Sequence, residues 1–114
     1  MYKTIFHLDE EEKITDVLRN INNLLQDMES EGEKIEIEVL ANSNGVKAFK
    51  KNRDKNRDKI KNVLEKNVKI ALCNNSLKKL ELTKEDFIDE AFIVTSGVGE
   101  LTRKQYNEWA YIKP

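Results

Sequence analysis

Segments with the character of β-strands alternate with helix-like segments along the whole 114-residue chain. The strand-like segments are rich in β-branched and aromatic residues or alternate apolar with polar ones, and helical stripes lie between them. Five strands are expected, at residues 2–8, 34–41, 68–73, 91–95 and 109–112. This alternation predicts one α/β domain over residues 1–114, with a mainly parallel sheet of about five strands.

The composition of two strand segments bears on their place in the sheet. In KIEIEVLA (34–41), apolar residues alternate with Glu36 and Glu38, which predicts one solvent-exposed face, at least along the first half of the strand, and suits an edge position. AFIVT (91–95) is almost continuously apolar, as is typical of a strand covered on both faces.

The clearest helix follows the first strand. Apolar residues from Ile14 to Met28 keep the three- and four-residue spacing of a single buried stripe. Asp9 and Glu12 have the spacing of a capping box at its start, and Gly32 is suited to end it.

Two further local signals are expected later in the chain. Asn67 is suited to end the helical stripe at Ile60, Val63 and Leu64 in the left-handed conformation. Thr83 and Asp86 have the spacing of another helix cap.

Composition limits the classes of partner. Twenty basic and 21 acidic residues leave a net charge of −1, so no overall field attracts nucleic acid or an anionic membrane. The apolar fraction of 39% implies a small core, which favours burial of further surface by oligomerisation. The single cysteine excludes an internal disulfide and fits a reducing compartment. No signal sequence or long apolar run is visible, and a cytoplasmic, non-membrane protein is expected.

A basic segment at 50–61 contains the sequence NRDK twice in tandem. Its charge suggests a nucleic-acid hypothesis, but no aromatic residue interrupts it. Lys50 and Asp54, and Asp54 and Arg57, have helical pairing distances, so a solvated helix face is favoured and nucleic acid is not expected as a partner.

Polar residues lie at the carboxyl ends of four of the predicted strands. They are His7, the loop from Asn42 to Gly45, Cys73 with Asn74 and Asn75, and Ser96 with Gly97. Because parallel sheets bind ligands at the carboxyl ends of their strands, these residues are expected to gather on one edge.

Cys73 is the most informative of these residues. It ends a buried strand, and the capping-type residues Asn74, Asn75 and Ser76 that follow it indicate the start of a helix. A helix N-terminus favours a thiolate, which would make Cys73 reactive. A small buried hydrophobe is the alternative interpretation.

The neighbouring candidates also have two interpretations. His7 could tune Cys73 or be a hydrogen-bonded structural histidine, and one His with one Cys cannot complete a metal site in a monomer. The segment Gly97-Val98-Gly99 could present N–H groups to an anion, or its glycines could serve only the geometry of a turn. The segment lacks the glycine pattern of a dinucleotide-binding site. Tyr106, Trp109 and Tyr111 could form a binding platform, although packing or a subunit contact is more common.

Five segments, in this order, resemble the DsrE/DsrF-like family: FHLDE (6–10), NSNGVKAF (42–49), ALCNNSL (71–77), SGVGELTRKQ (96–105) and WAYIKP (109–114). Together they span nearly the whole chain, and the last two are the most specific. The sequence departs from the family in two places: Glu108 stands where glycine often precedes the tryptophan, and the NRDK repeat makes the second helix unusually basic.

The resemblance implies a three-layer α/β/α domain that assembles as a trimer or hexamer. Better-understood members carry sulfur as a cysteine persulfide, and the family cysteine after the third strand corresponds to Cys73. The candidate binding residues around it are His7, Asn42, Gly45, Asn74, Asn75, Ser96, Gly97 and Gly99.

The functional hypothesis is a sulfur-relay protein. Cys73 would accept a sulfane sulfur from a donor protein and pass it to an acceptor, as a carrier or as a sulfurtransferase, without a cofactor. The alternative is a non-catalytic oligomeric module that binds a small anion or a protein partner.

Overall fold

The computed structural model describes residues 1–114 and contains one five-stranded sheet in which every strand pair is parallel. The strand order is β4-β3-β2-β1-β5. The strands are β1 (Tyr2–Leu8), β2 (Ile35–Ala41), β3 (Lys69–Cys73), β4 (Phe92–Val94) and β5 (Ala110–Ile112). The predicted α/β class and parallel sheet are therefore confirmed.

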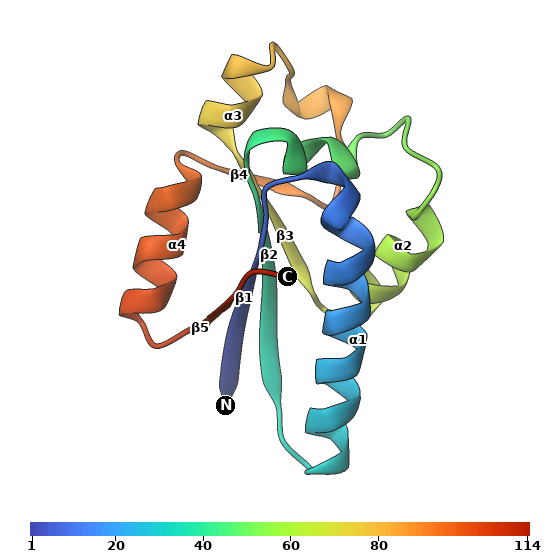
Figure 1. Ribbon diagram of the computed structural model, residues 1–114, viewed down its shortest axis with the longest axis vertical. Helices are drawn as coiled ribbons and strands as arrows, with labels where there is room; N and C mark the ends of the chain where they lie inside the picture. The colour runs from blue at the N-terminus through green and yellow to red at the C-terminus, as the bar shows by residue number, and fades with distance from the viewer.

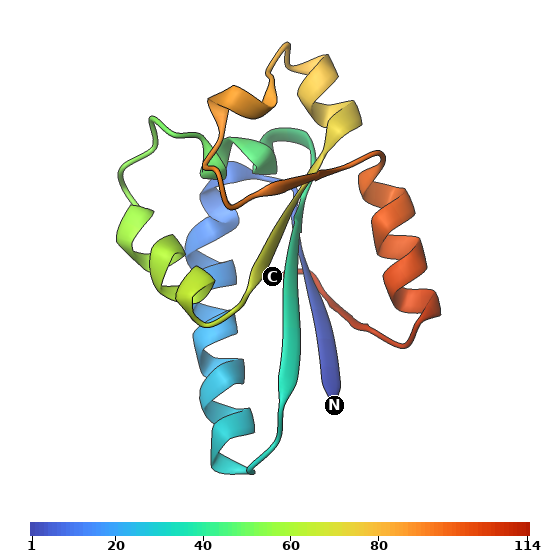
Figure 2. The same ribbon diagram turned by 180° about the vertical axis from the view of Figure 1, so that it is seen from behind.

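Helices cover both faces of the sheet. Helices α1 (Ile14–Ser30) and α2 (Arg57–Glu65) lie on one face and α4 (Gly97–Tyr106) on the other (Figures 1 and 2). Helix α3 (Asn74–Lys79) and the 3-10 helices η2 (Ser43–Phe49) and η3 (Lys84–Asp86) lie above the carboxyl ends of the strands (Figure 1). A further 3-10 helix, η1 (Glu11–Lys13), leads into α1. None of the helices has both the length and the apolar character needed to cross a membrane.

The larger core lies between the sheet and the layer of α1 and α2. The predicted stripe of α1 contributes Ile14, Val17, Leu18 and Ile21, all buried. At roughly 1.5–3 kcal/mol for each fully buried side chain, this stripe fixes α1 on the sheet. A smaller cluster on the α4 face contains Ile5, Leu40, Ala71 and Leu101.

Three local signals of the sequence are confirmed. Gly32 ends α1 in the left-handed conformation with φ +69°, and the Glu33 N–H donates to the carbonyl of Met28. Asn67 likewise has φ +67° after α2. Thr83 and Asp86 form a capping box around η3.

The predicted capping box of Asp9 and Glu12 is wrong. The chain enters α1 through η1, whose N-cap is Glu10 without a side-chain cap bond, so α1 begins only at Ile14. The Asp9 carboxylate instead lies 3.3 Å from Nζ of Lys113.

The edge position expected for 34–41 is also wrong. Strand β2 is the middle strand of the sheet, and α4 covers the face that carries its glutamates. Glu36 is exposed beyond the end of this cover, whereas Glu38 is only 2% exposed. The alternation of the sequence is real, but a helix and not solvent lies over its second half.

Strand β4 is an edge strand and is not covered on both faces as predicted. Phe92 and Ile93 are each 38% exposed. Helix α4 packs over β1, β2 and the middle of β3, and of β4 only Val94 packs against the smaller cluster on that face.

The basic segment is helical only in part. Residues 51–56 form turns, and α2 begins at Arg57, within the second NRDK copy. The expected Asp54–Arg57 pair forms at 3.2 Å, but Lys50 and Asp54 do not lie on a common helix. Near the other end of the chain, Glu108 has φ +69°, so the turn before Trp109 keeps a conformation natural to glycine.

The burial of Glu38 predicts a pH-dependent stability. Burial, a hydrogen bond with Glu100 and the negative charge of Glu100 raise the pKa of Glu38 from 4.5 to about 8. Between these values the folded protein holds a proton that the unfolded chain releases. The free energy of unfolding should therefore fall as the pH rises from 4.5 to 8, by at most about 1.4 kcal/mol per pH unit from this group.

Urea unfolding of the wild type and of Glu38→Gln at pH 5.5, 7.0 and 8.5 measures this effect. The free energy of unfolding of Glu38→Gln should fall less steeply with pH than that of the wild type. The variant should therefore become more stable relative to the wild type as the pH rises. Parallel stability profiles would contradict a proton on Glu38.

Candidate functional site

Cys73 is the last residue of β3 and directly precedes α3. It is 5% exposed, and the N-terminus of α4 lies against it. The Gly97 N–H, the first of α4, donates to Cys73 Sγ at 3.2 Å. The sulfur thus lies where the end of one strand and the beginnings of two helices meet.

The contact favours glycine at position 97. A Cβ there would lie 3.2 Å from both Asn42 Cβ and Cys73 Cβ and 3.3 Å from Cys73 Sγ. These separations are tighter than ordinary contacts, so a larger residue would require its neighbours or α4 to shift by a few tenths of an ångström. Gly97, Asn42 and Cys73, predicted to share one edge, are therefore brought together.

Two opposing influences act on the pKa of Cys73. Burial raises the pKa, since a thiolate is poorly solvated there. Hydrogen bonding from the Ser76 hydroxyl and from the N–H groups of Ser76, Gly97 and Asn75 lowers it and outweighs burial. The pKa of Cys73 therefore lies below that of an ordinary cysteine, as the helix start after it predicts.

Ser76 also connects the sulfur to the neighbouring loop. Its Oγ accepts the N–H of Ser43 at 2.7 Å, at the start of η2. Ser43 has a left-handed φ of 50°, which is uncommon for a residue other than glycine, asparagine or aspartate. This bond holds the loop that carries Asn42 beside α3.

His7 lies in a chain of hydrogen bonds and not in contact with the sulfur. Its Nε2 donates to Asn42 Oδ1 at 2.9 Å, and its Nδ1 lies 2.6 Å from the Tyr111 hydroxyl. An amide oxygen only accepts, so the neutral ring carries its proton on Nε2 and Nδ1 accepts from tyrosine. Because the Asn42 oxygen is engaged, its amide N–H groups remain available to other partners.

The other predicted residues play parts more distant from the sulfur. Gly45 is buried against β1, and a Cβ there would lie 2.1 Å from the Leu8 carbonyl oxygen. Ser96 caps α4, its Oγ accepting the Gly99 N–H at 3.1 Å, while the Cβ position of Gly99 faces the Arg103 guanidinium. Asn74 is the first residue of α3 and is half-buried.

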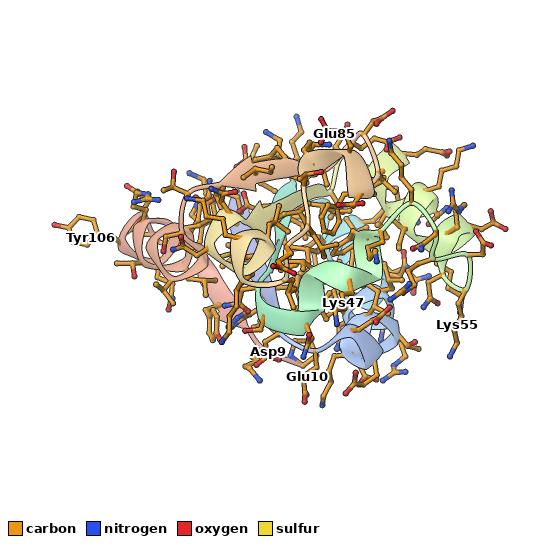
Figure 3. The ribbon with its side chains drawn as sticks, turned by 90° about the horizontal axis from the view of Figure 1, so that it is seen from above. Asp9, Glu10, Lys47, Lys55, Glu85 and Tyr106 are labelled. Atoms are coloured by element: carbon orange, nitrogen blue, oxygen red, sulfur yellow. The ribbon has the colours of Figure 1, made fainter.

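The three C-terminal aromatic residues have different surroundings. Tyr106 is 88% exposed and projects away from the body (Figure 3). Trp109 packs under the Lys104 ammonium, whose nitrogen lies 4.6 Å from the ring centroid. Tyr111 contacts His7. They do not form a common platform.

Sequence reasoning did not assign Ser76 and Tyr111 to the site. Ser76 carried a signal, since it occupies the third helical position after Cys73, where a side chain can turn back toward the cap. For Tyr111 no signal in the sequence indicated a contact with His7, because that contact depends on the pairing of β5 with β1.

The arrangement is suited to a nucleophilic thiolate. It supplies N–H and hydroxyl donors to the sulfur, and an oriented amide beside it. Within the structure, no group of three or more His, Cys, Asp or Glu side chains is placed to hold a metal ion.

Known structures share this architecture over their full length. The chain is 30% identical to MTH1491 of Methanobacterium thermoautotrophicum, a protein of unknown function, with a TM-score of 0.91 and all of both chains covered. It has the same fold as the ychN protein of E. coli, with 17% identity, a TM-score of 0.80 and complete coverage of both chains. No curated protein matches the chain.

The sequence of residues 3–114 matches the family model described as DsrE/DsrF-like family. The matched range includes every residue of the site around Cys73 and all five strands except Tyr2, the first residue of β1. The chain belongs to the DsrE/DsrF-like family.

Proposed function

We propose that this protein carries sulfane sulfur as a persulfide on Cys73. The observation that supports this most strongly is the set of donors around a buried sulfur, led by the Gly97 N–H at 3.2 Å. A thiol is a weak hydrogen-bond acceptor, whereas a thiolate or persulfide anion accepts strongly. A cysteine that served only as a small apolar core residue would have no need of these donors.

The proposed transfer conserves atoms and electrons without an added oxidant. The Cys73 thiolate attacks the outer sulfur of a donor persulfide, R–S–SH. A bond forms between Cys73 Sγ and that sulfur, the donor S–S bond breaks, and the donor leaves as the thiolate R–S⁻. An acceptor thiolate then attacks the outer sulfur and releases the Cys73 thiolate.

In this proposal the surrounding residues have separate roles. Gly97 and Ser76 stabilise the anion at Sγ, and Asn42 directs an amide N–H toward the outer sulfur. Tyr111 and His7 hold Asn42 in that orientation through their hydrogen-bond chain. His7 is therefore a positioning residue and not a ligand of sulfur.

The partners of the proposal are a sulfur donor and a sulfur acceptor, in the reducing cytoplasm. A trimer or hexamer of this chain is part of the proposal. Its support is the exposure of an apolar side chain next to the site, Val98, which is 68% exposed. A subunit covering Val98 would also limit access to Cys73, which belongs to the same junction.

The competing proposal is a non-catalytic binding module in which Cys73 is core. Its support is the 5% exposure of Cys73, which is typical of structural cysteines. The two proposals differ in what happens to the protein when sulfur is offered, as the loading experiment below measures.

The first prediction concerns thiolate formation. The rate of Cys73 alkylation by iodoacetamide should rise with pH through an inflection below that of free cysteine, because hydrogen bonds favour the thiolate. Ser76→Ala should move this inflection to higher pH. Ser30→Ala, at the far end of α1, is the matched control and should leave it unchanged. An ordinary thiol profile in the wild type would contradict the activated site.

The second prediction concerns sulfur loading. Incubation with polysulfide, or with a cysteine desulfurase and cysteine, should add one reducible sulfur atom to the wild type in intact-mass measurements. Cys73→Ser should fold but gain nothing, since the chain has no other cysteine. A wild type that stays unloaded while a known carrier is loaded would favour the binding module.

The third prediction concerns the hydrogen-bond chain. Tyr111→Phe keeps the ring but removes the donor to His7, so loading should persist while transfer to a small thiol slows about fivefold, the equivalent of one hydrogen bond. Tyr106→Phe removes an exposed hydroxyl and should transfer at the wild-type rate. Equal rates in the two variants would remove Tyr111 and His7 from the mechanism.

A further inference from the structure

A second concavity lies on the α4 face, away from Cys73. It encloses about 460 Å³ between β2, the beginning of β3 and the turns of α4 that carry Glu100 and Lys104. Its polar lining includes Glu38, Lys69, Glu100 and Lys104, and its apolar walls include Phe92 and Trp109. Since Cys73 ends β3 and Lys69 begins it, this pocket and the sulfur lie toward opposite ends of the same strand.

An unpartnered carboxylate oxygen belongs to the lining of this pocket. The Glu38 side chain is 3% exposed, yet its Oε2 has no hydrogen-bond partner. The Lys104 ammonium lies 3.6 Å from the other oxygen, Oε1, and 3.8 Å from Glu100 Oε2, which are ion-pair distances longer than a good hydrogen bond. When Glu38 is ionised, a buried acceptor without a donor is costly, so the ionised site favours a group that supplies an N–H there.

The charges around Glu38 indicate the sign of that group. Glu36, on its own strand, and Glu100, on α4, add negative charge to the lining, against Lys69 on β3 and Lys104 on α4. On the remaining neighbouring strand, β1, Ile5 is opposite Glu38 and the exposed Lys3 is opposite Glu36, outside the lining. With Glu38 ionised the lining carries three carboxylates and two ammonium groups, which leaves a place for one more positive charge.

The walls indicate the size and character of the ligand. Phe92 is partly exposed on the edge strand, and Trp109 packs under Lys104. A metal ion is a poor fit, because the Lys104 ammonium already lies between the two carboxylates. A body of a few carbon atoms with one cationic N–H group fits both the apolar walls and the acceptor.

We propose that this pocket binds a small organic cation, an alkylammonium or alkylguanidinium, whose N–H donates to Glu38 Oε2 and whose apolar part contacts Phe92 and Trp109. The proposal does not depend on sulfur chemistry at Cys73.

Binding in this pocket releases a proton. The free protein holds a proton on Glu38 at neutral pH, because burial and Glu100 raise its pKa to about 8. The cation keeps its own proton, and Glu38 loses its proton to solvent as the ion pair forms. The total charge of the lining is unchanged, and affinity increases with pH up to the pKa of Glu38.

The single tryptophan provides a direct readout of this site. Butylammonium and butylguanidinium are titrated into the full chain, in its natural assembly state, at pH 6.5 and 8.5. Trp109 fluorescence and the NMR signals of the Trp109 indole and Lys69 amide should change saturably. Affinity should be roughly 20-fold higher at pH 8.5, as expected for exchange with a proton of pKa about 8.

Matched variants separate this site from other causes. Glu38→Gln removes the negative charge and should abolish binding, whereas Glu33→Gln, on an exposed residue before β2, should bind as the wild type does. Cys73→Ser should also bind normally, whether or not it loads sulfur. If Glu38→Gln is unfolded, Phe92→Ala, on the exposed edge strand, should instead weaken binding several-fold and preserve its pH dependence.

Three results would overturn the proposal. One is the absence of saturable change at pH 8.5, and another is equal binding of the neutral analogue butanol. The third is a Trp109 fluorescence that changes when the protein is diluted but not when the cation is added. That result would show that a second copy of the chain fills the pocket.

Discussion

The contact between the Gly97 amide and the Cys73 sulfur joins parts of the chain that are 24 residues apart. Glycine suits this approach, because a Cβ at position 97 would lie 3.3 Å from the sulfur, closer than an ordinary contact. The approach fixes where α4 begins and therefore which part of the sheet it covers. The arrangement of that face depends on this contact. It places the sulfur under the first turn of α4, and it places Glu38 under the turns that carry Glu100 and Lys104.

The segment from β4 to β5 adds a residue to the site from the opposite edge of the sheet. Helix α4 crosses from one edge of the sheet to the other, and β5 then pairs with β1. That pairing puts Tyr111 opposite Ile5 and on the same face as His7, whose ring connects it to Asn42. A site at the end of β3 is thus supported by residues from the two ends of the chain.

Sequence reasoning succeeded where the cause is local. The left-handed residues Gly32 and Asn67 and the box of Thr83 and Asp86 depend on a few neighbouring residues, and each was predicted. The alternation at 34–41 suggests an exposed edge strand, whereas β2 is the middle strand of the sheet. The spacing of residues within one segment does not determine the order of the strands. The same reason explains the site: Cys73, Asn42 and Gly97 follow from the shared ends of parallel strands, whereas Tyr111 requires the β1–β5 register.

The two unusual groups of the α4 face are difficult to explain by stability alone. A buried carboxyl beside a second carboxyl and a buried sulfur that favours its anion each cost free energy relative to apolar residues of similar size. The fold has an apolar solution available, since Ile5, Leu40, Ala71 and Leu101 occupy the same face between them. Retaining a carboxyl group at Glu38 and hydrogen-bond donors at Cys73 is therefore better explained by the proposed ligands than by the packing of α4 on the sheet.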